Sequence, residues 1–111
     1  MLNQIILVGR LTRDVELKEG ENGSKFANLS LAIPRSFKNA EGEYDTDFVE
    51  CIASGNIATN TAEYCRKGDI VGVKGRIQTR IIEKEDKKES VMEIIAEKVT
   101  FLSSKPREEE D

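Results

Sequence analysis

The sequence contains no histidine and no tryptophan, and only two cysteines and two prolines among its 111 residues. The absence of histidine removes the commonest general base and most catalytic metal sites. Cys51 and Cys65 are not spaced as a CxxC pair, so the sequence has no zinc or redox motif. We interpret both as reduced thiols in the core, which indicates a reducing setting. These absences argue against an enzyme, and we expect no cofactor and no metal.

Long apolar runs are also missing. No stretch approaches the ~18 residues that a membrane-spanning helix needs. The first eight residues lack the basic segment that begins a signal peptide. We therefore expect a cytoplasmic protein with no membrane partner, and a chain of this length can build one modest core.

Positive charge is in deficit, with 17 basic against 21 acidic residues and a formal net charge of −4. Nucleic-acid binders usually show a basic footprint, so the total alone argues against one. The deficit is uneven, however, because residues 105–111 hold four of the acids and two of the bases. The first 104 residues are left with 17 acids and 15 bases, which leaves room for a locally basic face.

What is present is mostly a strand pattern. Apolar and polar residues alternate, or β-branched residues run together, over residues 3–11, 25–33, 45–54, 69–82 and 90–102. A helical spacing replaces this pattern only at residues 56–67, where Gly68 is placed to cap the helix. We expect Pro34 to end the second strand, and Gly72 and Gly75 indicate a bulge or a sharp bend in the long one.

Five strands, one short helix and a glycine bend favour an all-β fold with one short helix. We predict an OB-fold, a five-stranded Greek-key barrel, with a small open β-sandwich as the alternative. Turns are expected at residues 41–42, and a charged loop at residues 83–89. We assign residues 1–103 to the OB-fold domain and residues 104–111 to a short, acidic, disordered tail.

The long strand carries the most informative charge pattern. Successive side chains of a strand point to opposite faces, so Lys74, Arg76 and Arg80 share one face that holds no acid. Such a row of cations can follow a phosphate backbone. The alternative is a solvated face whose charge protects the strand from edge pairing.

A second cluster places an aromatic side chain between two cations. Phe37 lies between Arg35 and Lys38 in a polar segment, and its ring can offer a stacking face to a base. Arg35 and Lys38 would then contact phosphates. The alternative is that Phe37 plugs one end of the barrel.

Alternation in the third strand directs Val49 and Cys51 inward and Phe48 outward. An outward aromatic on a polar face is a candidate stacking platform, although it could instead pack against a cross-strand neighbour. Tyr44 flanks the same hairpin and is a further candidate for stacking. Arg10 closes the first strand and is a candidate phosphate contact.

Six segments in order resemble the bacterial and phage single-stranded DNA-binding proteins, and together they cover nearly the whole chain. They are NQIILVGRL at residues 3–11, ANLSLA at 27–32, RSFK at 35–38, TDF at 46–48, AEYCRKG at 62–68 and VKGRIQTR at 73–80. The family has an OB-fold, usually forms homotetramers, and wraps single-stranded DNA without sequence preference in replication, recombination and repair.

The resemblance implies roles for the same residues that the alternation selected. Phe37 and Phe48 would stack on bases, and the backbone path would be lined by Arg10, Arg35, Lys38, Lys74, Arg76 and Arg80. It also implies that the first strand builds the subunit contact through Asn3, Gln4 and Ile6. The protein would then be a cytoplasmic, nucleoid-associated homo-oligomer.

Four departures from the family pattern are visible. Ser54 and Ile82 occupy positions where members often carry further aromatics, Glu50 stands where a basic or neutral residue is common, and tryptophan is absent. The chain also stops at acidic residues without a terminal Pro-Phe, as in short-tailed members or a truncated product. Recruitment of partner proteins through the tail is therefore not expected.

The leading hypothesis is a sequence-independent single-stranded DNA-binding protein that coats and protects strands. The departures motivate an alternative, an OB-fold accessory such as a primosome component or an inactive paralogue that acts mainly through protein contacts.

Overall fold

The computed structural model of the chain describes residues 1–104. The disordered tail predicted for residues 104–111 lies outside the described residues apart from Ser104.

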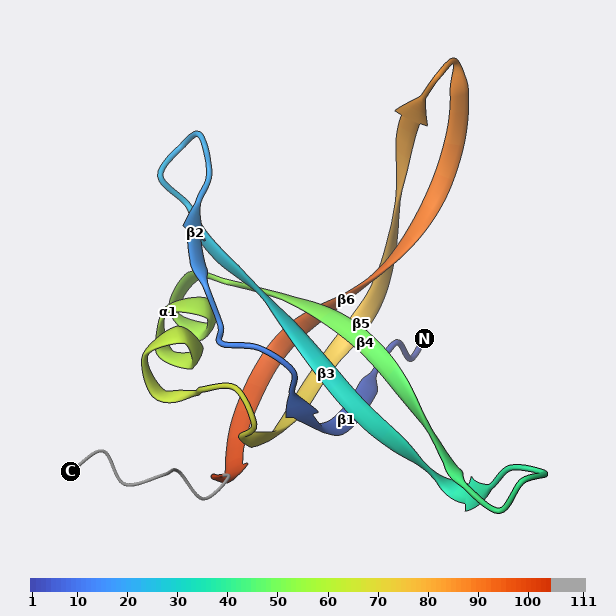
Figure 1. The fold of residues 1–111 in the computed structure, drawn as a ribbon. Coiled ribbons are helices and arrows are strands. Elements are labelled where there is room, and N and C mark those ends of the chain that lie inside the picture. Colours follow the sequence, from blue (N-terminus) through green and yellow to red (C-terminus); the bar gives the residue numbers. More distant parts are fainter. Residues whose placement is uncertain (105–111) are drawn as a thin grey trace.

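Five long strands close into a barrel, as predicted (Figure 1). Neighbouring strands follow the order β1-β5-β6-β4-β3, and β1 closes the circle by pairing with β3 at Arg10 and Leu11. A short strand β2 lies at the outer edge of β3, and one helix, α1, joins β4 to β5. The elements are β1 (Ile5–Leu11), β2 (Leu17–Glu19), β3 (Lys25–Lys38), β4 (Tyr44–Ser54), α1 (Gly55–Tyr64), β5 (Ile70–Lys84) and β6 (Lys87–Ser103).

Side chains at alternate positions of the strands point inward and fill the barrel. Leu29 and Leu31 on β3 point inward and are fully buried, while Ser30 between them points the other way and is covered, its hydroxyl accepting a hydrogen bond from Thr12. Val71 and Val73 on β5 also point into the barrel and are fully buried. Burying such side chains is worth about 1.5–3 kcal/mol each, so this small core supplies the main driving force for closure.

Gly75 allows β5 and β6 to approach closely. A Cβ atom at this position would lie 2.0 Å from the carbonyl oxygen of Ile95, closer than any side chain can come. The β5–β6 register shifts between Lys74 and Gly75, so the predicted irregularity is present and its cause is backbone contact.

The prediction that Pro34 ends the second strand was wrong. β3 continues to Lys38, and Pro34 still pairs with Thr46. The register shifts between Pro34 and Lys38, and such an irregularity tolerates a residue that has no N–H to donate. The β3–β4 hairpin is longer as a result.

The predicted end of the helix was also wrong. α1 ends at Tyr64, and Cys65 is already extended. The next backbone N–H groups find partners outside the helix: that of Lys67 donates to the Asp14 carboxylate at 2.7 Å, and that of Gly68 donates to the Leu11 carbonyl at 2.8 Å. These contacts tie the helix end to the end of β1.

Two hairpins extend from the barrel as arms, on the side away from α1 (Figure 1). The β3–β4 arm turns near Gly42, whose φ of +79° fits the predicted turn. The β5–β6 arm turns at Glu85 and Asp86, which both have positive φ values. The expected loop over residues 83–89 is therefore a tight turn, and the strands on both sides are longer than predicted.

Candidate functional site

Phe48 stands uncovered on the outer face of β4. Its partner across the β3–β4 ladder is Ala32, whose side chain is too small to cover a ring, and 73% of Phe48 is exposed. The alternative of cross-strand packing is thus not seen. The same face continues along β4 with Glu50 and Ile52.

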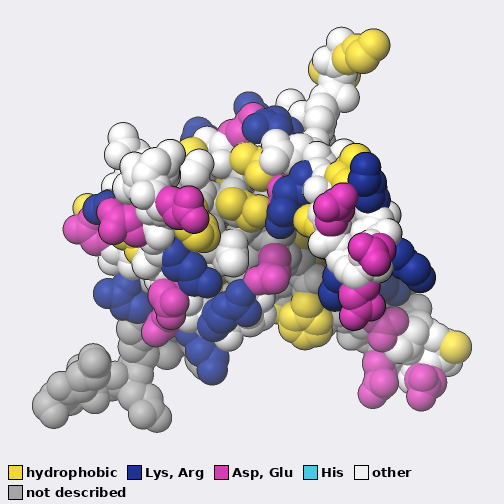
Figure 2. Space-filling view, turned by 90° about the horizontal axis from the view of Figure 1, so that it is seen from above, with side chains coloured by type: hydrophobic (Ala, Val, Ile, Leu, Met, Phe, Trp, Pro, Cys, Tyr) yellow, Lys and Arg dark blue, Asp and Glu magenta, His cyan; other side chains and the backbone are white. Residues whose placement is uncertain are grey.

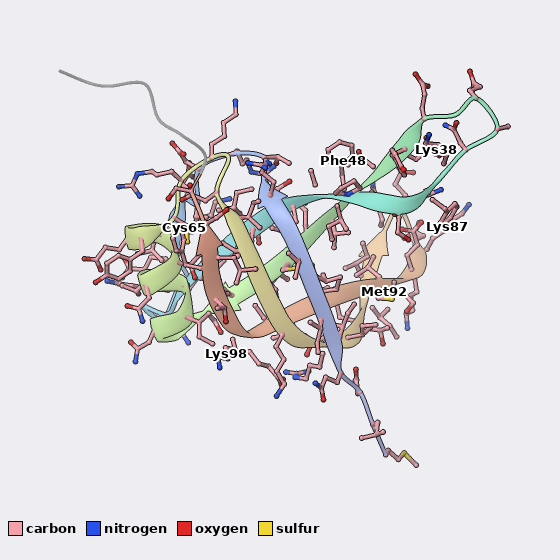
Figure 3. All side chains as sticks on the ribbon, turned by 90° about the horizontal axis from the view of Figure 1, so that it is seen from below. Lys38, Phe48, Cys65, Lys87, Met92 and Lys98 are labelled. Carbon is pink, nitrogen blue, oxygen red and sulfur yellow. The ribbon has the colours of Figure 1, made fainter. Side chains whose placement is uncertain are left out.

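The β3–β4 arm carries the other two aromatic candidates. Phe37 and Tyr44 are both more than half exposed, so Phe37 does not plug the barrel. Lys38 pairs with Tyr44 across the ladder, and its Nζ lies 5.8 Å from the centre of the Tyr44 ring, within reach of a cation–π interaction. Figure 3 shows Phe48 nearer the barrel and Lys38 nearer the tip of this arm.

An open groove of about 310 Å³ lies beside the outer face of β4. Glu50 and Ile52 form one side of it, and Arg80 and Glu93 form part of the other. The strand pairing explains this arrangement. Ile52 aligns with β6, and β6 pairs with β5. Paired residues of neighbouring strands point to the same face of a sheet, so alternate residues of β5 face the same way as Ile52. Arg80 therefore shares this groove with Glu50 and Ile52, which continue the face of Phe48 along β4.

Arg80 is held by a carboxylate. Its Nε donates to Glu93, which also accepts a hydrogen bond of 3.4 Å from the Gln78 amide. The hydrogen bond from Arg80 lowers the pKa of Glu93, and so does the one from Gln78. The Glu93 side chain is 13% exposed and that of Arg80 is 60% exposed, so the acid sits deeper in the groove than the guanidinium.

Arg35 is not brought to the face of Phe48. Its Nε and Nη2 both donate to Asp47, at 3.1 and 2.9 Å, and Nη1 lies 3.7 Å from Asp45. The hydrogen bond from Arg35 lowers the pKa of Asp47. Asp45 and Asp47 alternate with the outward residues of β4, so this cluster occupies the opposite face of the arm.

The other predicted cations differ in whether they already form hydrogen bonds or ion pairs within the protein. Arg76 donates to the Gln78 amide oxygen at 2.7 Å, and its Nε lies 3.4 Å from Glu97. Arg10 donates to the Gly68 carbonyl at 2.7 Å. Lys74 is exposed and forms no ion pair with any described residue. Lysine, arginine and acidic side chains intermingle over the surface seen in Figure 2, rather than forming a patch of one sign.

Glu50, the acid that seemed out of place, has a partner. Nη2 of Arg13 donates to its carboxylate at 2.5 Å. Arg13 follows β1, outside every motif that the sequence singled out, and lies 37 residues away along the chain. Nothing in the local pattern pointed to it, because only barrel closure brings the two together.

The residues predicted for a subunit contact lie at the start of the chain. Asn3 uses its amide within its own chain, donating to and accepting from the backbone of Ile77 at 2.7 and 2.9 Å. Gln4 and Ile6 are exposed.

The part of the chain that the structure describes shows neither a metal site nor a membrane-spanning helix. Residues 1–104 contain no group of three or more side chains that could hold a metal ion. Their helix is too short and too polar to cross a membrane.

Comparisons with known proteins place the chain. Residues 2–102 match the Single-strand binding protein family. The chain is 50% identical to Single-stranded DNA-binding protein B of Bacillus subtilis over 109 residues, which is 97% of this chain and 96% of that protein. It is 46% identical over 106 residues to Single-stranded DNA-binding protein 3 of Listeria innocua, covering 95% of this chain and 66% of that protein.

A solved structure shows the same fold. The single-stranded DNA binding protein from Thermus aquaticus, as a deletion mutant, superposes with a TM-score of 0.77 at 27% identity. The match covers 92% of this chain and 51% of the Thermus chain. The sequence, the barrel and the relatives agree: the chain belongs to the single-strand binding protein family.

Proposed function

We propose that the chain binds single-stranded DNA by stacking bases on exposed aromatic rings and by contacting phosphates with nearby cations. The observation that carries this proposal is the uncovered ring of Phe48 on the same face of β4 as Glu50 and Ile52, which line a groove together with Arg80. Base stacking tolerates any sequence because every base has a π-face. Tyr44 and Phe37 extend the stacking surface along the arm, and Lys38 adds charge there.

The remaining cations complete the proposed path. Lys74, Arg76 and Arg10 lie on β5 and β1 and would contact phosphates beyond the groove, as would Arg35 on the opposite face of the arm. No bond is made or broken in this mechanism, in keeping with a family that is not enzymatic. Its role would be to coat and protect strands in the cytoplasm during replication, recombination and repair.

The test is a fluorescence-anisotropy titration of labelled oligo-dT and of a duplex of the same length, each at low and high salt. Phosphate contacts make affinity fall with salt, with a slope of about −0.7 per phosphate for single strands. We expect tight, salt-sensitive binding of oligo-dT and weak binding of the duplex. Equal affinity for the two at low salt would refute the proposal.

We also propose that the protein assembles as a homo-oligomer, with a tetramer as the expected state. Among the described residues β1 pairs with β3 only at Arg10 and Leu11, so the backbone edge of residues 5–8 has no ladder partner on that side. Ile6 and Val8 are more than half exposed on the outer face of the same strand. A free edge and exposed apolar side chains favour pairing with a second copy.

The ion pairs around the proposed path favour one alternative to DNA binding as the main function. Several cations on the proposed path are already neutralised by acids, as an OB-fold accessory that acts through protein contacts would allow. That function predicts weak binding of oligo-dT even at low salt, together with capture of a partner protein.

A further inference from the structure

We propose that Glu50 and Glu93 act as built-in competitors of DNA phosphates and thereby set the affinity of the groove. In the free protein each carboxylate pairs with an arginine, and a bound strand competes with the carboxylate for that positive charge. This inference rests on the proposed function, since it concerns how the same groove releases a strand.

The position of the two acids is the first support. Glu50 and Glu93 both line the groove, Glu50 from β4 and Glu93 from β6. Arg80 lines the groove from β5, and its Nε donates to Glu93. Both acids thus line the groove into which the Phe48 face of β4 continues, where the proposed function places the strand.

The contacts of the two arginines are the second support. Arg80 gives its Nε to Glu93, and Arg13 gives its Nη2 to Glu50. These N–H groups are the donors that arginine uses for phosphate. A phosphate takes these N–H groups when the carboxylate releases them. The Arg13–Glu50 pair is exposed on both sides and therefore weak, and in the other pair Arg80 exposes 60% of its side chain while Glu93 exposes 13%.

The competition predicts how the salt dependence of DNA affinity changes when one of the two acids loses its charge. An arginine that is paired with a carboxylate carries no net charge toward the strand, so it neutralises little phosphate charge. Replacing the acid by its uncharged amide frees one full positive charge. The logarithm of affinity should then fall more steeply with the logarithm of salt, by about 0.7 for each freed cation.

The experiment compares Glu93→Gln, Glu50→Gln and the double variant with the unmodified chain. Each variant keeps the shape of the side chain and removes one negative charge. We expect each to bind oligo-dT roughly two- to fivefold more tightly at moderate salt, with slower dissociation and the steeper salt slope.

The matched control is Glu63→Gln. Glu63 is exposed on α1, and its carboxylate has no hydrogen-bond or ion-pair partner among residues 1–104, so this variant makes the same change in net charge away from the groove. We expect its affinity and salt slope to stay close to those of the unmodified chain. An equal gain from Glu63→Gln would overturn the proposal, because net charge would then explain the effect.

Arg80→Ala separates competition from simple repulsion. If Glu93 occupies Arg80, removing Arg80 costs little in the unmodified chain and much more once Glu93 has become glutamine. Equal costs in both backgrounds would contradict the proposal. Weaker binding by both Glu93→Gln and Glu50→Gln would also overturn it, since the acids would then position the arginines for DNA.

The preference of the unmodified chain for oligo-dT over the duplex separates the two proposals. If the unmodified chain prefers oligo-dT to the duplex and the amide variants bind no more tightly, only the competition is refuted. If neither the unmodified chain nor any variant prefers oligo-dT, both proposals are refuted.

Discussion

Phe48 and Tyr64 are two exposed aromatic side chains on different surfaces. Phe48 is 73% exposed beside the groove, and Tyr64 is 69% exposed on α1. If bases stack on Phe48, Phe48→Ala should lose about 1–3 kcal/mol of binding, roughly a five- to 150-fold weaker affinity. Tyr64→Ala should leave the affinity for oligo-dT unchanged in the same anisotropy titration, and equal losses would speak against the assigned face.

Cys51 offers a prediction about stability and pH. Burial raises the pKa of its thiol to about 11, with the nearby Glu50 charge adding to the effect. In the unfolded chain the thiol ionises at a lower pH, so the contribution to stability is full at neutral pH and is lost as the pH rises through 11.

The loss can be measured by urea unfolding at pH 7.5 and pH 10.5. Between these values the unmodified chain should lose about 2 kcal/mol more stability than Cys51→Ala, since each unit of pKa difference is worth about 1.4 kcal/mol. Identical pH dependence in the two proteins would show that burial of Cys51 does not shift its titration.

Single residues were predictable where strand alternation fixes their direction. The outward placement of Phe48 and the common face of Lys74, Arg76 and Arg80 follow from a period of two. Ion-pair partners were not predictable in the same way. Glu50 meets Arg13 only because the barrel closes.

Among the elements, the β5–β6 pair depends most on one backbone contact. Gly75→Ala would place a Cβ atom 2.0 Å from the Ile95 carbonyl oxygen, and that rigid backbone atom has to move. We expect a loss of about 3 kcal/mol or failure to fold.

Gly72→Ala is the control in the same strand, because its nearest contact would be an ordinary 3.5 Å from Leu102. It should cost less than about 1 kcal/mol in urea unfolding. Similar losses from the two variants would mean that strand propensity, rather than close approach, governs this strand.

Element identities were predictable from hydrophobic period, but element ends were not. β3 runs through Pro34 because the irregularity there needs no N–H from proline. α1 ends before Gly68 because Asp14 and the Leu11 carbonyl, both remote in sequence, take the N–H groups that a longer helix would use. Contacts with residues remote in sequence therefore determine where β3 and α1 end.

For the whole molecule, the fold class was within reach of the sequence, whereas the strand order and the assembly were not. Five strands and one helix left a closed barrel and an open sandwich as alternatives, and the family resemblance favoured the barrel. The free edge of β1 became visible only once the pairing partners were known.

Assembly through β1 can be tested with Ile6→Glu. A charge on this exposed apolar position should split the oligomer into smaller species with the fold retained, as measured by size-exclusion chromatography with light scattering and by circular dichroism. The matched change Ile81→Glu, on the exposed side of the β5–β6 arm, should leave the assembly intact. An unmodified chain that runs as a monomer would refute the proposed oligomer.

Cross-linking tests the location of the proposed strand path most directly. Oligo-dT in which 5-iododeoxyuridine replaces some thymidines is bound to the protein, irradiated, and the linked peptides are identified by mass spectrometry. If the strand lies across the outer face of β4 and along its arm, the links should fall on Phe48, Tyr44 or Phe37. Links confined to Tyr64 or Phe101, beside α1, would contradict the proposed interface.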